Sequence, residues 1–363
     1  MKKILLLLLA FIGYNSFAQY NFTDVVDIEK SSIKSQDRTG TCWSFATVSF
    51  LESEIIRMHN KKIDLSEMYN VSLIYEDKAK NYVLRQGKAN FSQGSLAHDV
   101  LRAVEAKGLM LESAFNGKPY GVESFDHSEL VAGLKGFLDG VIKNGEPTNF
   151  WLPAFNSIVA NYLGNYPDKF TYEGKSYTPE AFANHLGIKA SNYVHLSSFS
   201  HHPFYKKFIL EVPDNYSNGS FYNLPLDEFV QNVEEALRNG YSLAWDGDVS
   251  EKGFSAREGI AVLPKTKRDD LFTLPGEELE VNQEERQANF LKYSTTDDHL
   301  MHVVGMAKDQ NGTKYFIIKN SWGEIGPYQG YLYMSEAYFK MKTVSVSVHK
   351  DALMKSTKKA IGL

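Results

Sequence analysis

Apolar residues in the first third of the chain recur at steps of three and four positions. From Thr41 to about Met58 the sequence contains neither Gly nor Pro, and its apolar positions repeat with this spacing. That pattern predicts a helix packed along one face. Similar patterns predict three further helices, over Ser66–Arg85, Gly94–Lys107 and Leu226–Asn239.

Beyond Gly240 the pattern changes to short runs rich in Val, Ile, Tyr and Phe, separated by turn residues. Asn311-Gly312, between two of these runs, is a strong hairpin signal. Helices followed by an antiparallel sheet predict an α+β fold, with a cleft between the two halves as the natural place for a site. The predicted strands are Tyr241–Trp245, Met301–Ala307, Lys314–Lys319, Gly330–Met334 and Val344–His349.

The middle of the chain, from about Phe115 to Tyr222, has weak periodicity and many Tyr, Phe, Asn, Pro and Gly residues. We interpret it as an insertion rather than a separate domain. The predicted organisation is a signal peptide at 1–18, a helical lobe at 19–114, an insertion with return helices at 115–240, an antiparallel β lobe at 241–349 and a C-terminal tail at 350–363.

The N-terminus has the pattern of a secretory signal peptide. Two lysines precede the unbroken apolar run Ile4–Ile12, and Ser16-Phe17-Ala18 provides small residues for cleavage after Ala18. The run is about half of the ~20 residues that a membrane span needs. We therefore expect an exported protein, periplasmic or extracellular, that is soluble and free of the membrane after cleavage.

Composition narrows the class of protein further. Lys and Arg number 39 against 44 Asp and Glu, for a net charge of −5, which argues against a nucleic-acid partner. The single cysteine forms no internal disulfide, and no Cys/His spacing predicts a metal site. The adjacent His201 and His202 have no third ligand at a usable spacing, so we interpret them as loop histidines. No cofactor is predicted.

The chemistry converges on the single cysteine. Cys42 stands where a loop enters the first strong helix, and the positive end of the helix dipole favours the nucleophilic thiolate. A buried structural thiol is the alternative. His299 begins a predicted strand and Asn320 follows another, so a thiol, an imidazole and an orienting amide are all present. The Gln36 amide is positioned to donate a hydrogen bond to an oxyanion formed at the sulfur.

Two neighbouring features have simpler interpretations. His302 lies three residues from His299 and would point to the opposite side of the strand, so His299 is the preferred base. Asp297-Asp298 is interpreted as a strand-entry turn rather than as a pair of acid/base carboxylates.

Three separated motifs carry a family resemblance. Gln36–Ala46 resembles the nucleophile segment of papain-like cysteine peptidases, His299–Gly305 is similar to their histidine strand, and Lys319–Gly323 to their asparagine segment. The resemblance implies a two-lobed papain-like fold, a helical lobe followed by a barrel-like β lobe, that acts on peptide substrates. It also implies the roles of the site residues: Cys42 as nucleophile, His299 as its imidazolium partner, Asn320 as the group that holds the ring, Trp322 as its cover, Gln36 in the oxyanion hole and Gly94 as the point where substrate backbone approaches.

Within this family the chain resembles the bleomycin hydrolase and aminopeptidase C branch. Thr39 stands where ordinary papain-type enzymes have a disulfide cysteine, and the segment between Gln19 and Gln36 is too short for a long inhibitory propeptide. The branch implies that the C-terminal tail enters the cleft, where the Leu363 carboxylate would hold the substrate's free amino group. It also forms hexamers, which leaves a homo-oligomer open.

An aminopeptidase is therefore the favoured function. A papain-like endopeptidase is the alternative within the same class, and a non-catalytic peptide-binding protein on this fold is the alternative from another class.

Overall fold

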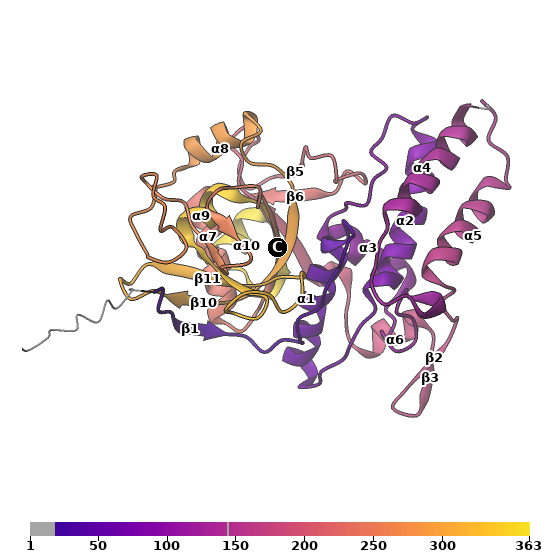
Figure 1. Ribbon diagram of the computed structural model, residues 1–363, viewed down its shortest axis with the longest axis horizontal. Coiled ribbons are helices and arrows are strands. Elements are labelled where there is room, and N and C mark those ends of the chain that lie inside the picture. Colours follow the sequence, from indigo (N-terminus) through magenta and orange to yellow (C-terminus); the bar gives the residue numbers. More distant parts are fainter. Residues whose placement is uncertain (1–18, 144) are drawn as a thin grey trace, which may run out of the picture.

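The computed structural model describes residues 19–143 and 145–363, and the predicted signal peptide at 1–18 lies outside the described residues. The chain forms two lobes, one built of helices and one built around a large sheet (Figure 1). Within the described part of the chain, no helix is both long enough and apolar enough to cross a bilayer.

The helical lobe is built around α1 (Cys42–His59), which contacts both the other helices and the sheet. The capping residue before α2 (Glu67–Leu84) shows how the local sequence sets a helix start. The Ser66 hydroxyl accepts a hydrogen bond from the Tyr69 N–H and caps the helix. The other helices of this lobe are α2 (Glu67–Leu84), α3 (Ala97–Lys107), α4 (Ser128–Lys143), α5 (Trp151–Leu163) and α6 (Pro179–His185), with the hairpin β2 (Phe170–Tyr172) and β3 (Lys175–Tyr177) beside α6.

The second lobe contains one large, mostly antiparallel sheet, in the order β5-β6-β4-β13-β7-β10-β11-β12-β9-β8, with β1 also pairing with β10. Its strands are β1 (Thr23–Asp27), β4 (Tyr193–Ser197), β5 (Lys207–Ile209), β6 (Ser220–Asn223), β7 (Leu243–Gly247), β8 (Phe254–Ser255), β9 (Ile260–Ala261), β10 (His299–Lys308), β11 (Lys314–Lys319), β12 (Tyr331–Ser335) and β13 (Thr343–His349). Its helices are α7 (Leu226–Arg238), α8 (Gln283–Leu291), α9 (Glu336–Lys342) and α10 (Lys355–Ile361).

The segment predicted as one insertion, 115–240, divides between the two lobes. Helices α4 and α5 pack on α2, whereas β4, β5 and β6 extend the sheet next to β13. The segment was not recognisable as two parts because its periodicity is weak throughout. The α+β prediction holds, because a helical lobe packs against a β lobe.

The central strands separate two hydrophobic cores. Along β10, Leu300 packs into the core that contains α1, while Met301 and Val303 pack into the core that contains α7. This alternation follows from the two-residue period of a strand. The N-terminal end of α1 and the start of β10 therefore meet on one face of the sheet, and α7 covers the other.

Candidate active site

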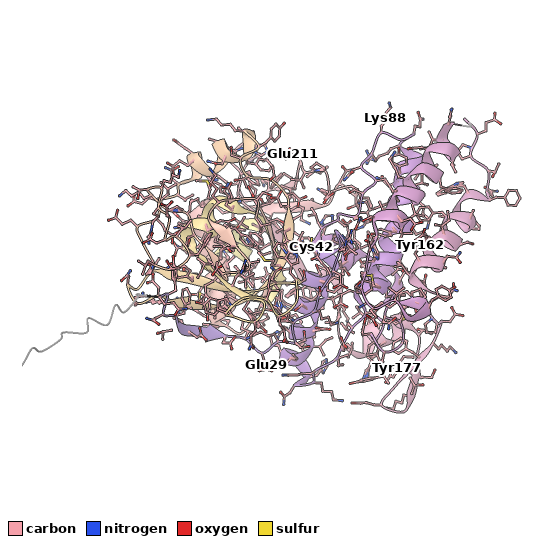
Figure 2. The ribbon with its side chains drawn as sticks, viewed as in Figure 1. Glu29, Cys42, Lys88, Tyr162, Tyr177 and Glu211 are labelled. Carbon is pink, nitrogen blue, oxygen red and sulfur yellow. The ribbon has the colours of Figure 1, made fainter. Side chains whose placement is uncertain are left out.

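Cys42 is the first residue of α1 and is 8% exposed. The loop before it is held in place by Gln93, whose Oε1 accepts the Gly40 N–H at 2.7 Å and whose carbonyl accepts the Trp43 indole N–H at 2.8 Å. These bonds join the thiol's loop to the segment that carries Gly94. The helix N-terminus, positive by its dipole, is thereby aimed into the space between the lobes (Figure 2).

The structure brings the predicted histidine and asparagine together. His299 Nε2 donates to Asn320 Oδ1 at 2.8 Å, and the Trp322 ring stacks on the imidazole with centroids 4.5 Å apart. Because Nε2 carries the proton in this bond, Nδ1 of the neutral ring is the free base. The backbone of Leu300, the next residue, hydrogen-bonds to the Cys42 thiol, so the start of β10 lies directly against the nucleophile.

Gln36 connects the remaining two segments. Its Oε1 accepts the Ser321 hydroxyl at 2.6 Å and its Nε2 donates to the Thr39 carbonyl at 2.6 Å. The Thr39 carbonyl can only accept a hydrogen bond, which fixes the orientation of the amide and leaves its second N–H uncommitted by these bonds. Gln36, Cys42, His299 and Asn320 thus come together from three regions of the chain, an arrangement suited to nucleophilic catalysis by a thiol.

Burial favours the neutral forms of the catalytic pair. It raises the pKa of the Cys42 thiol to about 12, an effect that the carboxyl groups of Asp297, Asp214 and Asp246 increase. Burial also lowers the pKa of His299 to about 4, although the hydrogen bond to Asn320 raises it. The helix dipole predicted from the sequence acts in the opposite direction on the thiol.

The carboxyl groups beside the thiol are functional candidates that sequence reasoning missed. The carboxylate of Asp214 lies against Gly94, so close that an added Cβ would stand 1.8 Å from its Oδ2. Asp297 interacts with Asp246. Its neighbour Asp298 accepts the backbone N–H groups of Val249 and Ser250, as expected of a turn residue. The signal that could have revealed Asp246 is an acidic residue inside the apolar strand Leu243–Gly247.

The placement of the Leu363 carboxylate in the cleft stays a prediction. The last residues form α10, which packs on α7: Asn232 Nδ2 donates to Thr357 Oγ1 at 2.8 Å, and Ile361 enters the core on the α7 side. The central strands separate that core from Cys42. The tail has enough apolar and helix-forming residues for Lys355–Ile361 to fold as a helix on the β lobe, and Leu363 follows it, 49% exposed.

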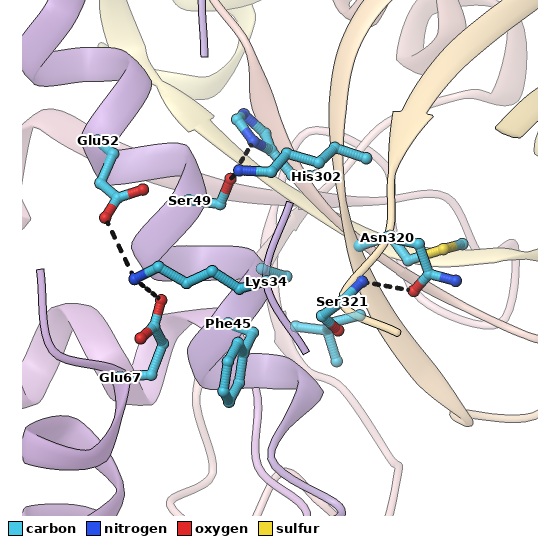
Figure 3. Close-up of a pocket in the computed structure, with 12 residues that line it drawn as sticks. Lys34, Phe45, Ser49, Glu52, Glu67, His302, Asn320 and Ser321 are labelled. Atoms are coloured by element: carbon cyan, nitrogen blue, oxygen red, sulfur yellow. Dashed lines mark hydrogen bonds and ion pairs between the residues drawn. The ribbon is translucent and has the colours of Figure 1, made fainter. Parts of the chain in front are cut away.

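Two other groups of histidines fall outside the catalytic arrangement. His302 Nδ1 lies 2.8 Å from Ser49 Oγ, which also accepts a hydrogen bond from Lys319 Nζ at 2.7 Å (Figure 3). His201 and His202 both approach the Glu211 carboxylate, a third ligand that the sequence spacing did not reveal. These three side chains could hold a metal ion, and their mutual ion pairing explains their position equally well.

Figure 3 also shows a cluster of charges where the loop before Gln36 meets α1 and α2. Lys34 Nζ lies 2.7 Å from Glu67 Oε1 and 3.8 Å from Glu52 Oε1. Burial alone would lower the pKa of Lys34, but the two carboxylates raise it, so the ammonium stays charged. This cluster fixes the loop that leads from Lys34 to Gln36.

The two-lobed fold, with a thiol, an imidazole and an amide between the lobes, defines a papain-like cysteine peptidase. A model described as "Papain family cysteine protease" matches residues 22–128, and one described as "Peptidase C1-like family" matches residues 153–362. The second match covers more than half of the chain, which therefore belongs to the peptidase C1-like family.

Similar proteins span nearly the whole chain. Aminopeptidase G of Lactobacillus delbrueckii subsp. lactis is 24% identical over 387 residues, covering 94% of this chain and 87% of the relative. Aminopeptidase C of Streptococcus thermophilus is 24% identical over 390 residues, covering 93% and 84%. The solved structure of PepW from Lactobacillus rhamnosis has a TM-score of 0.74 at 19% identity, covering 94% of this chain and 84% of that one, and so has the same fold.

Proposed function

We propose that the protein is an exported aminopeptidase that hydrolyses peptides through a Cys42 thioester. The observation that carries the mechanism is the hydrogen bond from His299 Nε2 to Asn320 Oδ1, which leaves Nδ1 as the base beside the thiol. The aminopeptidase specificity is supported by the names of the relatives that align over more than nine-tenths of the chain. Export rests on the signal-peptide pattern of residues 1–18.

In the first half-reaction, Sγ of Cys42 attacks the carbonyl carbon of the scissile amide as its proton passes to His299 Nδ1. The carbonyl oxygen becomes an oxyanion, to which the Cys42 backbone N–H and a Gln36 Nε2 hydrogen donate; one such donor contributes ~3–4 kcal/mol in comparable sites. The C–N bond then breaks. His299 gives its proton to the departing amine, and the acyl group remains on sulfur as a thioester.

The second half-reaction returns the enzyme to its starting state. Water attacks the thioester carbonyl while Nδ1 of His299 takes one of its protons, and the same two donors stabilise the oxyanion. The C–S bond breaks, the thiolate regains its proton from His299, and the carboxylic acid leaves. Asn320 keeps the His299 ring in one orientation through both steps. Trp322 shields the hydrogen bond between His299 and Asn320 from water.

The test is cleavage of a fluorogenic leucyl-aminomethylcoumarin and of its N-acetylated twin, by the wild type and by Cys42→Ala, in the presence of a reductant. We expect the free-amino compound to be cleaved, the acetylated one to be spared, and Cys42→Ala to be inactive. Equal cleavage of the two compounds would instead indicate an endopeptidase with an open cleft. Absence of any Cys42-dependent cleavage would favour a peptide-binding protein.

A further inference from the structure

The loop Glu211–Asn218, which begins at Glu211 above the cleft (Figure 2), is held rigidly against the helical lobe. Asn215 organises the loop from within, because its Nδ2 donates to the Leu210 carbonyl at 2.8 Å and its Oδ1 accepts the Gly219 N–H at 2.7 Å. Tyr216 fastens the loop to α2 by donating to Asp77 Oδ2 at 2.8 Å. Because these hydrogen bonds hold the loop both internally and against α2, its other side chains occupy fixed positions.

The side chain that this loop presents to the cleft is Asp214. Its Oδ1 accepts from Asn90 Nδ2 at 2.9 Å, and its Oδ2 is the carboxylate atom nearest to Gly94. If substrate backbone runs past Gly94, as the family resemblance implies, then Asp214 stands in its path. The carboxylate both blocks a longer chain and offers negative charge to whatever group stops there.

Two further carboxyl groups, those of Asp246 and Asp297, interact with Asp214 and with the Cys42 thiol. Asp246 is 2% exposed, and its Oδ2 accepts from the Ser345 hydroxyl at 3.0 Å. Apart from each other, its Oδ1 and the Oδ2 of Asp297 have no hydrogen-bond partner within residues 19–143 and 145–363. Burial and mutual proximity raise the pKa of Asp246 to about 7 and that of Asp297 well above its usual range. In the free protein a hydrogen bond from the protonated Asp297 to Asp246 satisfies these oxygens, and a cationic ligand would displace that proton.

Lys78, whose ammonium interacts with Asp214 and Asp297 at longer range, directs its hydrogen bond elsewhere. Lys78 donates to the Gly94 carbonyl, and burial lowers the pKa of its ammonium to about 8. A second ammonium, with three N–H donors, would match the oxygens of this group of carboxyl side chains and would favour their ionised forms. The α-ammonium of a peptide is such a group, and it lies two bonds from the carbonyl carbon of its own residue.

A pocket of about 550 Å³ opens between Asp297 and the start of the same loop. Its lining is largely apolar, and most of it comes from two places, the loop 211–213 and the end of α8 with the residues that follow. The apolar side chains are Val212, Pro213, Phe290, Leu291 and Tyr293. A concave apolar surface of this size, with charge at its edge, suits a side chain attached to a charged group.

We propose that Asp214 and Asp297 hold the free α-ammonium of the substrate, and that the adjoining pocket accepts the side chain of its first residue. This inference rests on the aminopeptidase function proposed above, and it names the residues that determine which substrates the enzyme accepts. Recognition of the substrate's amino group, which the family resemblance assigns to the C-terminal tail, is thereby assigned to Asp214 and Asp297. Peptides that begin with an aliphatic or aromatic residue are the substrate class.

The test measures kcat and KM for leucyl-aminomethylcoumarin, arginyl-aminomethylcoumarin and N-acetylleucyl-aminomethylcoumarin in Asp214→Asn and Asp297→Asn. Loss of a charged hydrogen bond should lower kcat/KM for both free-amino compounds by ~10- to 100-fold, mainly through KM. Cleavage of the acetylated compound should stay level or rise. Asp269→Asn, which removes an exposed carboxylate elsewhere, is the matched control and should behave as the wild type.

Several results would overturn the proposal. One is an unchanged ratio of free-amino to acetylated cleavage in both variants, and another is a loss confined to the arginyl compound, which would mean that the carboxylates recognise a basic side chain. A wild type that cleaves nothing would instead refute the proposed function. A second readout covers poorly active variants: leucinamide should protect Cys42 from alkylation by iodoacetamide in the wild type but not in Asp214→Asn, with melting temperatures confirming that both are folded.

Discussion

Replacing Gly94 by alanine tests the close approach of Asp214 directly. The new methyl group would stand 1.8 Å from Oδ2, 2.4 Å from Cγ and 2.7 Å from Oδ1 of Asp214. Because all three atoms are too close, rotating the carboxylate does not relieve the overlap. The whole group must withdraw by roughly 1.5 Å to reach ordinary contact.

That withdrawal has a calculable cost. It stretches the 2.9 Å hydrogen bond from Asn90 to Asp214 and strains a loop that Asn215 holds rigid. Overpacking together with a weakened bond to a charged group should lower the free energy of unfolding by ~1–3 kcal/mol. The same movement takes the carboxylate out of the cleft, so the preference for free-amino substrates should fall as well.

Chemical denaturation and the free-to-acetylated cleavage ratio are the two measurements. Gly133→Ala is the matched control, because Gly133 lies in α4 with no atom within 4 Å of an added Cβ. That variant should gain ~0.5–1 kcal/mol from the helix propensity of alanine and keep its specificity. A Gly94→Ala protein with wild-type stability and an unchanged cleavage ratio would refute the contact with Asp214 and the role assigned to it.

Three further predictions concern the catalytic residues and the charges behind them. Asn320→Ala frees the His299 ring, and steady-state kinetics should show kcat lower by ~10²-fold with KM little changed; a change in KM alone would contradict an orienting role. In His299→Ala the thiol keeps its raised pKa without a base, so iodoacetamide labelling of Cys42 should be slow at pH 7 and quicken steadily as pH rises, whereas an unchanged pH profile would exclude His299 as base. Lys34→Met removes the ammonium beside Glu67, whose pKa burial raises to about 8, so that Glu67 takes up a proton and urea unfolding at pH 7 should show a loss of ~1–3 kcal/mol; unchanged stability would contradict the charged cluster.

The elements that could be predicted from the sequence are those with strong local periodicity. The helix that starts at Cys42 and the strand at the start of which His299 stands were both expected within two residues of their observed bounds. In each case the apolar positions repeat with the period of the element, so local sequence and tertiary packing agree. The convergence of Cys42, His299 and Asn320 was expected from their motifs.

The parts that could not be predicted depend on contacts between distant, aperiodic segments. Asn90 and Asp214 are separated by 124 positions, and the loop that carries Asp214 has no repeating pattern. Glu211 approaches His201 and His202 by a turn of the same loop, so ligand spacing along the chain did not reveal it. The helix Lys355–Ile361, which packs on α7, was not predicted, because the tail was described from resemblance alone.

The central claim is that Cys42 carries the acyl group of the substrate. Rapid mixing of the wild type with excess leucyl-aminomethylcoumarin, quenching in acid and mass spectrometry of the digested protein would measure this directly. The account predicts a leucyl adduct on the peptide that contains Cys42, present only when substrate turns over and lost in Cys42→Ala. Hydrolysis with the adduct on another residue, or hydrolysis that persists in Cys42→Ala, would contradict it.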